Sequence, residues 1–294
     1  MFFLNNSIDS KELIMAIREI SWEVSDLLRS YSFNQKDTSR YIEKLNIKNL
    51  NSGPVTSADL KANEMIIQGI KKYFPKANWG FLSEENYKKR SEIVFFQDWI
   101  WIIDPLDGTK DFINRTGEYA VHIALTHQKK VVLSVVLIPS KEELWFFLDG
   151  EGSWCESKNS EQKLIKEINS KMISELKVVI SRSYRPQELI YLLEELKPLQ
   201  VIGMGSVGYK IISIIKGEAD LYISYPIKGK SSPKDWDIVP PEAIIRGCGG
   251  YFTNLKGENI DFLNDDFNQE EILVASMNKN HNEICLAISK IINR

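Results

Sequence analysis

The first seventy-five residues carry two stretches whose apolar positions repeat with a helical period. From Leu13 to Leu27 the apolar residues recur at alternating steps of four and three, which places them on one face of an α-helix. The segment PVTSADLKANEMIIQGIKKYF, residues 54–74, predicts a loop that leads into a second helix, and Pro75 ends that helix. Asp59 then lies near its first turn. A polar stretch separates the two predicted helices.

From residue 79 the pattern changes to short apolar runs separated by turn residues, which is typical of β-strands. Five strands are expected here: WGFLS (79–83), DWIWIID (98–104), EYAVHIALT (118–126), KVVLSVVLI (130–138) and ELWFFL (143–148). A polar tract from about Glu156 to Lys171 follows them and predicts a connector. The first half of the chain therefore predicts helices followed by a sheet.

The second half alternates between strand and helix patterns. Strands are expected at 178–182, 200–203, 219–224, 250–254 and 271–276, and helices at 186–196, 206–217, 237–247 and at the end of the chain. Such alternation predicts a second α/β unit with its own sheet. We therefore divide the chain into an N-terminal α+β part, residues 1–157, and a C-terminal α/β part, residues 158–294.

Composition and charge exclude several classes of protein. The net charge of −3 and the pI near 5.8 argue against a general binder of nucleic acid or of a membrane surface, because such proteins need a basic field. The three cysteines lie far apart without CxxC spacing, so neither a disulfide framework nor a zinc knot is expected. The start of the chain lacks the features of a signal peptide, and no apolar run is long enough to span a membrane. We expect a soluble, cytoplasmic protein.

The sequence DPLDGTKDF, residues 104–112, follows an apolar run and concentrates carboxylates. Pro105 fixes the backbone after Asp104, and Gly108 permits a tight turn after Asp107. Like charges this close repel each other unless a cation lies between them, and oxygen ligands without His or Cys favour a hard cation such as Mg²⁺. The plainer alternative is that Asp-Pro and Asp-Gly are common turn dipeptides.

Two further acidic segments extend this pattern. FLSEEN places Glu84 and Glu85 at another strand end, and KDWDIVPPEAIIRGCGG places Asp237 at the start of an apolar helix. Each has an ordinary explanation, since a Glu pair is usually solvated and an Asp before a helix is usually a cap. The spacing of the acidic residues excludes an EF-hand. Asp104 and Asp107 are also one residue too far apart for an aspartyl-phosphate enzyme of the haloacid dehalogenase kind.

Together with PVTSAD and VHIAL, these stretches resemble, in the same order, the Mg²⁺-dependent, lithium-sensitive phosphatases that include inositol monophosphatases and 3'(2'),5'-bisphosphate nucleotidases. The resemblance covers residues 54–250. It implies a layered α-β-α-β-α sandwich whose N-terminal part holds the larger sheet and most metal ligands. The C-terminal part would hold the smaller sheet and supply Asp237 and substrate contacts. Two or three Mg²⁺ ions are implied as cofactors. The sequence does not fix the oligomeric state, and a homodimer is one option.

Carried over by position, the resemblance implies a role for each acidic residue. The implied metal ligands are the side chains of Glu84, Asp104, Asp107 and Asp237 and the carbonyl of Leu106. Asp59 would hold a further ion or orient the attacking water, and Thr109 would help Glu84 position that water. Gly108 and Thr109 would present backbone N–H groups to the phosphate at a helix start. Asp111 has no role to transfer, and an effect on the helix dipole is the plainer interpretation.

The branch of the family is indicated by three other stretches. The lysine in DGTKDF resembles the bisphosphate nucleotidases. VVISRSY resembles their SRSH stretch, with Ser183 as a substrate contact and Tyr184 in place of the histidine. GMGSVGYK resembles their glycine-serine turn, and its Gly205, Ser206 and Lys210 suit a contact with ribose or the second phosphate. As an alternative, Gly205 and Ser206 only cap the next helix.

The loop YPIKGKSSPKDWD brings three lysines close to Asp237, which are Lys228, Lys230 and Lys234. Our hypothesis is that one or more of them meets the non-reacting phosphate of a bisphosphate substrate, as a point charge on a flexible stem. The alternative is that they are ordinary exposed lysines.

We therefore expect an enzyme that acts on a small phosphate ester and does not bind nucleic acid or membranes. It would remove the 3'-phosphate of adenosine 3',5'-bisphosphate, and of its phosphosulfate relative, by attack of a metal-activated water, and so clear the by-product of sulfate activation. The alternatives are an inositol monophosphatase or fructose bisphosphatase and, more distantly, a non-catalytic homologue that binds metal or nucleotide. His122 has no paired nucleophile and is interpreted as a packed or surface residue.

Overall fold

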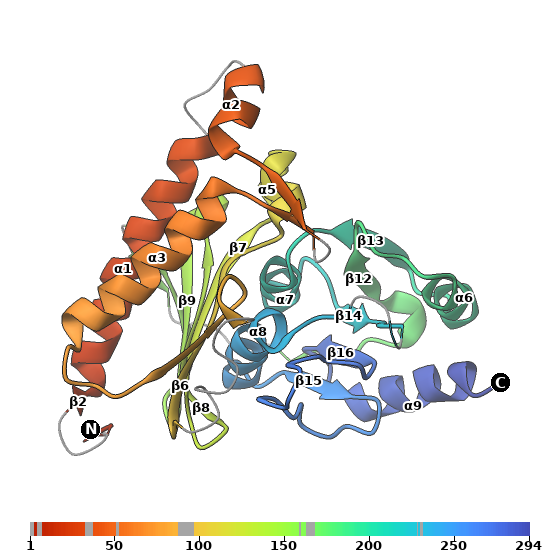
Figure 1. Ribbon diagram of the computed structural model, residues 1–294. Coiled ribbons are helices and arrows are strands. Elements are labelled where there is room, and N and C mark those ends of the chain that lie inside the picture. The colour runs from red at the N-terminus through yellow and green to blue at the C-terminus, as the bar shows by residue number, and fades with distance from the viewer. Residues whose placement is uncertain are drawn as a thin grey trace.

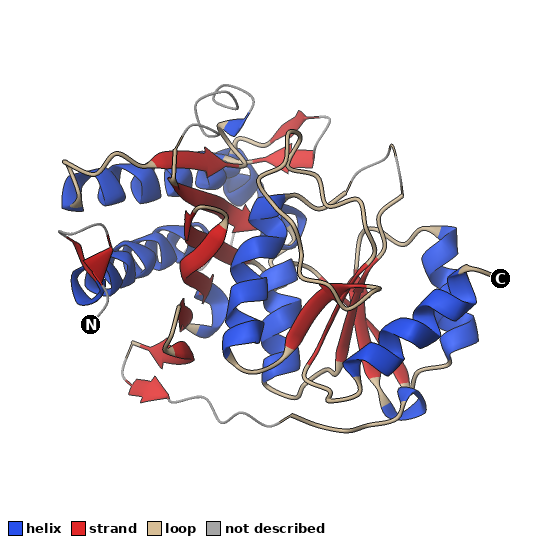
Figure 2. Cartoon of the chain, turned by 90° about the horizontal axis from the view of Figure 1, so that it is seen from below, coloured by secondary structure: helices blue, strands red, loops and turns tan. Residues whose placement is uncertain are grey.

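Two β-sheets stand side by side in the computed structural model, with helices on both outer faces and between them (Figure 1). The structure describes residues 3–4, 8–32, 38–50, 53–87, 97–158, 160–162, 168–227, 229 and 232–294. The view from below shows the same order of helices, sheet, helices, sheet and helices (Figure 2). The expected five-layer sandwich is therefore confirmed.

The first sheet has seven strands in the order β11-β10-β9-β8-β7-β6-β5. The strands are β5 Gly80–Ser83, β6 Trp99–Asp107, β7 Ala120–His127, β8 Lys130–Ile138, β9 Glu143–Leu148, β10 Gly152–Ser157 and β11 Ser160–Gln162. Only β5 and β6 pair in parallel; the other neighbours are antiparallel. All nine residues of β6 are buried, because helices cover both faces of the sheet.

The outer face of this sheet is covered by α1 (Ser10–Ser32) and α3 (Ser57–Tyr73), as Figure 1 shows. Trp101 and Ile103 of β6 belong to the core on this side. Ile100 and Ile102 belong to the core on the other side, because successive side chains of a strand point to opposite faces. Arg18 of α1 forms a salt bridge of 2.6 Å with Glu156 of β10, which fixes α1 across the sheet.

The second sheet has five strands in the order β13-β12-β14-β16-β15. They are β12 Lys177–Ser181, β13 Gln200–Met204, β14 Leu221–Ser224, β15 Tyr251–Asn254 and β16 Leu273–Ser276. The helices on its outer face are α6 Gln187–Leu196 and α9 His281–Ile292, and those between the two sheets are α7 Val207–Ile215 and α8 Asp235–Gly247. Helix α8 contributes Ile244 to the core beneath the first sheet and Ile245 to the core beneath the second.

The strands and helices expected from the pattern are present, with ends that differ by a few residues. Several short elements were not expected: β1 Phe3–Leu4, β2 Ile8–Asp9, α2 Thr38–Leu45, β3 Lys48–Leu50, β4 Gly53–Val55, η1 Pro139–Lys141, η2 Ile173–Glu175, β10 and β11. Elements this short show too few repeats to reveal a period. The expected boundary between residues 157 and 158 falls at the end of β10, before β11, which is the edge strand of the first sheet. In the described part of the chain, no helix combines the length and the apolar character that a membrane crossing needs.

Candidate active site

Three carboxylates meet at the end of β6. The side chains whose oxygens lie within 4.8 Å of one another are Asp104, Asp107 and Asp237; we call them the carboxylate cluster. The pairing of β6 with β7 shifts register between Asp104 and Asp107, where Pro105 has no N–H to offer the ladder. Asp104 accepts the N–H of Leu106 at 3.0 Å. Gly108 has φ of 89°, a left-handed conformation suited to glycine, and leads into α5 (Thr109–Ile113).

Asp237 reaches the cluster from the second half of the chain, in the first turn of α8. It accepts the backbone N–H of Lys234 at 2.6 Å, so it also caps the helix. The start of α8 is anchored by buried Asp235, which accepts the N–H of Leu263 and the side-chain N–H of Gln269, each at 2.7 Å. Asp237 therefore both caps α8 and belongs to the carboxylate cluster.

Glu84 follows β5 and lines the same cavity as Asp107 and Asp237 of the carboxylate cluster. Asp59 is buried at the start of α3, where it accepts the N–H of Thr56 at 2.8 Å and the hydroxyl of Thr109 at 3.1 Å. The resemblance implies that Thr109 helps Glu84 to position the attacking water. In the structure the Thr109 hydroxyl lies within hydrogen-bond distance of Asp59, at 3.1 Å, and of the Leu106 carbonyl, at 3.2 Å.

Burial and mutual repulsion favour protons on these acidic groups. Burial, followed by the charge of Asp237, raises the pKa of Glu84 well above its usual range. Burial, followed by the charge of Glu84, does the same to the pKa of Asp104. Burial and the charge of Asp107 raise the pKa of Asp237 to about 7. Carboxylates packed in this way ionise together when a cation lies between them. Because all the donors are oxygens, the residues present fit a hard divalent cation such as Mg²⁺.

Asp107 is held from the protein side by two groups. Gly208, at the start of α7, donates its N–H to Asp107 Oδ2 at 3.1 Å, and His122 Nε2 lies 3.3 Å from the same oxygen. His122 is fully buried; burial lowers the pKa of its imidazole, while the Asp107 charge opposes this effect. The residue is packed, as expected, but next to an acidic group. The signal that would have found it is strand register, since His122 pairs with Asp104 across β6 and β7.

The glycine-serine turn before α7 runs along the cavity. Gly205 and Lys210 line the cavity, and the buried Lys210 ammonium donates to the Gly205 carbonyl. Burial lowers the pKa of Lys210 to about 8, although neighbouring carboxylates oppose this. Ser206 is fully buried and accepts the N–H of Tyr209 at 2.9 Å. Ser206 thus acts as a helix cap, as in the plainer alternative, whereas Gly205 and Lys210 line the cavity.

Arg182 joins the two parts of the chain beside the cavity. Its guanidinium forms ion pairs with Asp111 and with Glu118, and it donates to the Gly203 carbonyl at 3.1 Å. A Cβ at Gly205 would lie 2.5 Å from the Asp111 carboxylate, so the turn packs closely on α5. Asp111 therefore connects α5 to the second sheet, a role that the dipole interpretation did not include.

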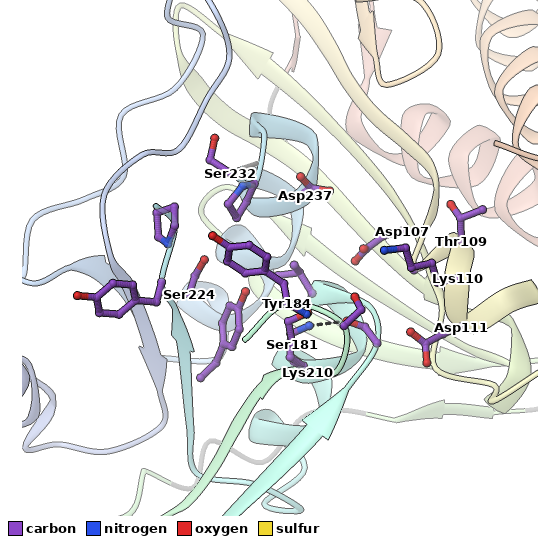
Figure 3. Close-up of a pocket in the computed structure, with 18 of the residues that line it drawn as sticks. Asp107, Thr109, Lys110, Asp111, Ser181, Tyr184, Lys210, Ser224, Ser232 and Asp237 are labelled. Atoms are coloured by element: carbon purple, nitrogen blue, oxygen red, sulfur yellow. Dashed lines mark hydrogen bonds between the residues drawn. The ribbon is translucent and has the colours of Figure 1, made fainter. Parts of the chain in front are cut away.

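The lysines near the site differ in where their ammonium groups lie. Lys110 is exposed and lines the cavity, and Figure 3 shows it beside Asp107. Lys234 instead donates its ammonium to the side chain of Asn268, and it is not among the described residues that line the cavity. Lys228 and Lys230 lie outside the described residues.

Aromatic side chains form the wall across from the acidic groups. The lining includes Ser183, Tyr184, Tyr222 and Tyr225, and Figure 3 shows Tyr184 across the cavity from Asp107 and Thr109. Rings of this kind offer apolar faces for stacking. The cavity therefore combines an acidic end, positive charge and an aromatic wall.

Comparisons of sequence point to one group of proteins. The model of the inositol monophosphatase family matches residues 9–293. The chain is 34% identical over 209 residues to the 3'(2'),5'-bisphosphate nucleotidase CysQ of Salmonella typhimurium, which is 71% of this chain and 79% of that protein. It is 32% identical over 216 residues to the protein of the same name from Escherichia coli K12, which is 74% of this chain and 82% of that protein.

Solved structures show the same fold. CysQ from Bacteroides thetaiotaomicron, a bacterial member of the inositol monophosphatase family, has a TM-score of 0.71 at 24% identity, over 93% of this chain and 99% of that chain. A staphylococcal IMPase-I complexed with products has a TM-score of 0.74 at 19% identity, over 96% of each chain.

Proposed function

Because the chain belongs to the inositol monophosphatase family, a family of phosphatases, we propose that it is a Mg²⁺-dependent 3'(2'),5'-bisphosphate nucleotidase. Its substrate is adenosine 3',5'-bisphosphate, and also the phosphosulfate relative of that nucleotide, and the 3'-phosphate is removed. The observation that carries this proposal is a single cavity in which carboxylates, lysines and aromatic rings face one another. The printed names of the similar bacterial proteins support the same substrate class.

The chemistry proposed is direct hydrolysis. The carboxylate cluster would hold Mg²⁺, which would lower the pKa of a water molecule, neutralise phosphoryl oxygens and stabilise the departing alkoxide. The proposed ligands are Glu84, Asp104, Asp107, Asp237 and the carbonyl of Leu106. Asp59 and Thr109, which are hydrogen-bonded to each other, orient the attacking water together with Glu84. The water oxygen bonds to phosphorus as the bond from phosphorus to the 3'-oxygen breaks, so no covalent enzyme intermediate forms.

The remaining lining residues provide contacts for the rest of the substrate. Gly108 and Thr109 present backbone N–H groups to the reacting phosphate. Lys210 and Lys110 add positive charge, and Lys110 meets the non-reacting phosphate because its ammonium is on an exposed, flexible stem. Tyr184 stacks on the purine, which an aromatic ring does as well as the histidine it replaces. Ser183 and Gly205 also line the cavity and contact the sugar.

The test is a panel of substrates with Mg²⁺. Release of phosphate is measured from adenosine 3',5'-bisphosphate, inositol monophosphate and fructose bisphosphate, each with Mg²⁺ and with EDTA. We expect the highest kcat/KM with the nucleotide and no release in EDTA. A higher kcat/KM with inositol monophosphate or fructose bisphosphate contradicts the proposed substrate, and no release from any of the three contradicts the proposed activity.

A further inference from the structure

His122 lies between the two segments that carry the carboxylate cluster. It is on β7, with 0% of its surface exposed, and both ring nitrogens face oxygens of other elements. Nε2 is 3.3 Å from Asp107 Oδ2, and Nδ1 is 3.1 Å from the carbonyl oxygen of Trp236. Trp236 directly precedes Asp237, so one imidazole ring spans from one carboxylate to the backbone that holds another.

The carbonyl of Trp236 is available because of a proline in α8. In an α-helix this carbonyl would accept the N–H of the residue four positions later, which here is Pro240. Proline has no N–H, and a buried carbonyl without a partner is unfavourable. His122 Nδ1 supplies the contact that the helix cannot. The first turn of α8, and with it Asp237, is thereby attached to the first sheet.

The other side of the ring is fitted to Asp107 with little free space. A Cβ added at Gly208 would lie 2.3 Å from His122 Nε2, so only glycine at position 208 leaves room for the ring. The N–H of the same glycine donates to Asp107 Oδ2. Gly208 and His122 thus both lie against Asp107 Oδ2. Together they fix the direction in which the Asp107 carboxylate points.

We propose that His122 is a positioning residue that sets the separation between the Asp107 and Asp237 carboxylates. The inference rests on the proposed function, because its effect is on the divalent cation that these carboxylates would hold. Groups that orient metal-binding carboxylates typically change metal affinity or activity by about 10- to 100-fold when removed. We therefore expect loss of the Asp107 contact to weaken Mg²⁺ binding about tenfold or more.

Two substitutions separate the two nitrogens. A glutamine amide can reach the position of Nε2 beside Asp107, whereas an asparagine amide can reach the position of Nδ1 and donate an N–H to the Trp236 carbonyl. We expect both variants to weaken Mg²⁺ binding about tenfold or more, because each of them keeps the contact on one side of the ring and loses the other. Binding is measured by calorimetry without substrate, and thermal unfolding is recorded in EDTA. The matched control is His127→Asn, on the same strand but stacked on Trp99, which should leave Mg²⁺ binding unchanged.

The outcomes distinguish this inference from the proposed function. Mg²⁺ affinity equal to that of the wild type in either variant would overturn the positioning role. A wild-type chain that binds no Mg²⁺ would contradict the proposed function itself.

A second variant tests the same contact from α7. Gly208→Ala puts a methyl group against the imidazole and, by displacing it, should also weaken Mg²⁺ binding about tenfold. Adding His122→Ala to Gly208→Ala should weaken Mg²⁺ binding no further, because both changes remove the same contact, that of the imidazole with Asp107. Additive losses would show that the two residues act separately and would overturn the inference.

Discussion

Removal of one carboxylate from the cluster should stabilise the metal-free protein while it abolishes activity. In Asp237→Asn the volume of the side chain is nearly unchanged, and the amide oxygen can still accept the N–H of Lys234 that caps α8. What disappears is a negative charge that burial and the charge of Asp107 make unfavourable. The folded state should therefore gain free energy relative to the unfolded chain.

The size of this gain follows from the pKa of Asp237. A rise from 3.8 to about 7 corresponds to about 4 kcal/mol above pH 7, at 1.36 kcal/mol for each tenfold change in proton affinity. Part of this gain is offset, because the amide does not fully reproduce the hydrogen bond that the Asp237 side chain shares with Asp104. We expect a net gain of about 2 kcal/mol or more.

The sign of the pH dependence is fixed by the direction of the shift. The unfolded chain loses the Asp237 proton near pH 4, while the folded chain keeps it until near pH 7. The wild type therefore loses stability as pH rises through this range, and the advantage of Asp237→Asn should grow from near zero at pH 4 to its full value above pH 7.

The assay is denaturant unfolding in EDTA at pH 5 and pH 8, with the exposed Asp265→Asn as the matched control. The control should change the free energy of unfolding by no more than about 0.5 kcal/mol. Mg²⁺ should stabilise the wild type, because it binds the folded state, and should stabilise Asp237→Asn much less. An Asp237→Asn variant that is no more stable than the wild type at pH 8, or whose gain is the same at pH 5, would refute the electrostatic account.

Three further changes test other parts of the site. Asp104→Asn should lower kcat about a hundredfold or more, since metal stabilisation of the phosphoryl oxygens is worth several kcal/mol; substantial Mg²⁺-dependent phosphate release would show that the site is assigned wrongly. Lys110→Ala should raise KM for the bisphosphate about tenfold, which corresponds to the loss of one charge-assisted hydrogen bond. It should leave KM for a nucleoside 3'-monophosphate unchanged. The control, Lys234→Ala, should change KM for neither substrate. Arg182→Ala should lower the free energy of unfolding by about 2 kcal/mol, because it leaves the buried Asp111 carboxylate unpaired; denaturant curves that superimpose on the wild type would dismiss the connecting role.

Local pattern was sufficient for much of the fold and for part of the site. The run from Trp99 to Asp107 is apolar and ends in carboxylates separated by Pro105, so both the strand and the rigid acidic loop can be read from adjacent residues. Glu84 and Asp237 could be placed at a strand end and a helix start, and the cavity that they share is the one that the acidic pattern required.

Contacts between distant segments could not be predicted in this way. The Lys234 ammonium is directed by Asn268, far along the chain, and nothing near Lys234 indicates that partner. Alternation along β7 places His122 on one face of the sheet, but it does not say that α8 covers that face. Nor does it say that Pro240 leaves a free carbonyl there. These features depend on how the two sheets pack together.

The position of α8 also limits how this protein can be assembled. Ile244 and its neighbours complete a core whose other half is the first sheet, including Ile100 and Ile102. During synthesis the first sheet emerges with that face uncovered, and the helices that cover it, α7 and α8, follow only at residues 207–215 and 235–247. A fragment that ends at the boundary between the halves would expose this apolar surface and aggregate. We therefore expect the first sheet and α8 to fold together, because the carboxylate cluster is complete only when Asp237 of α8 lies beside Asp104 and Asp107.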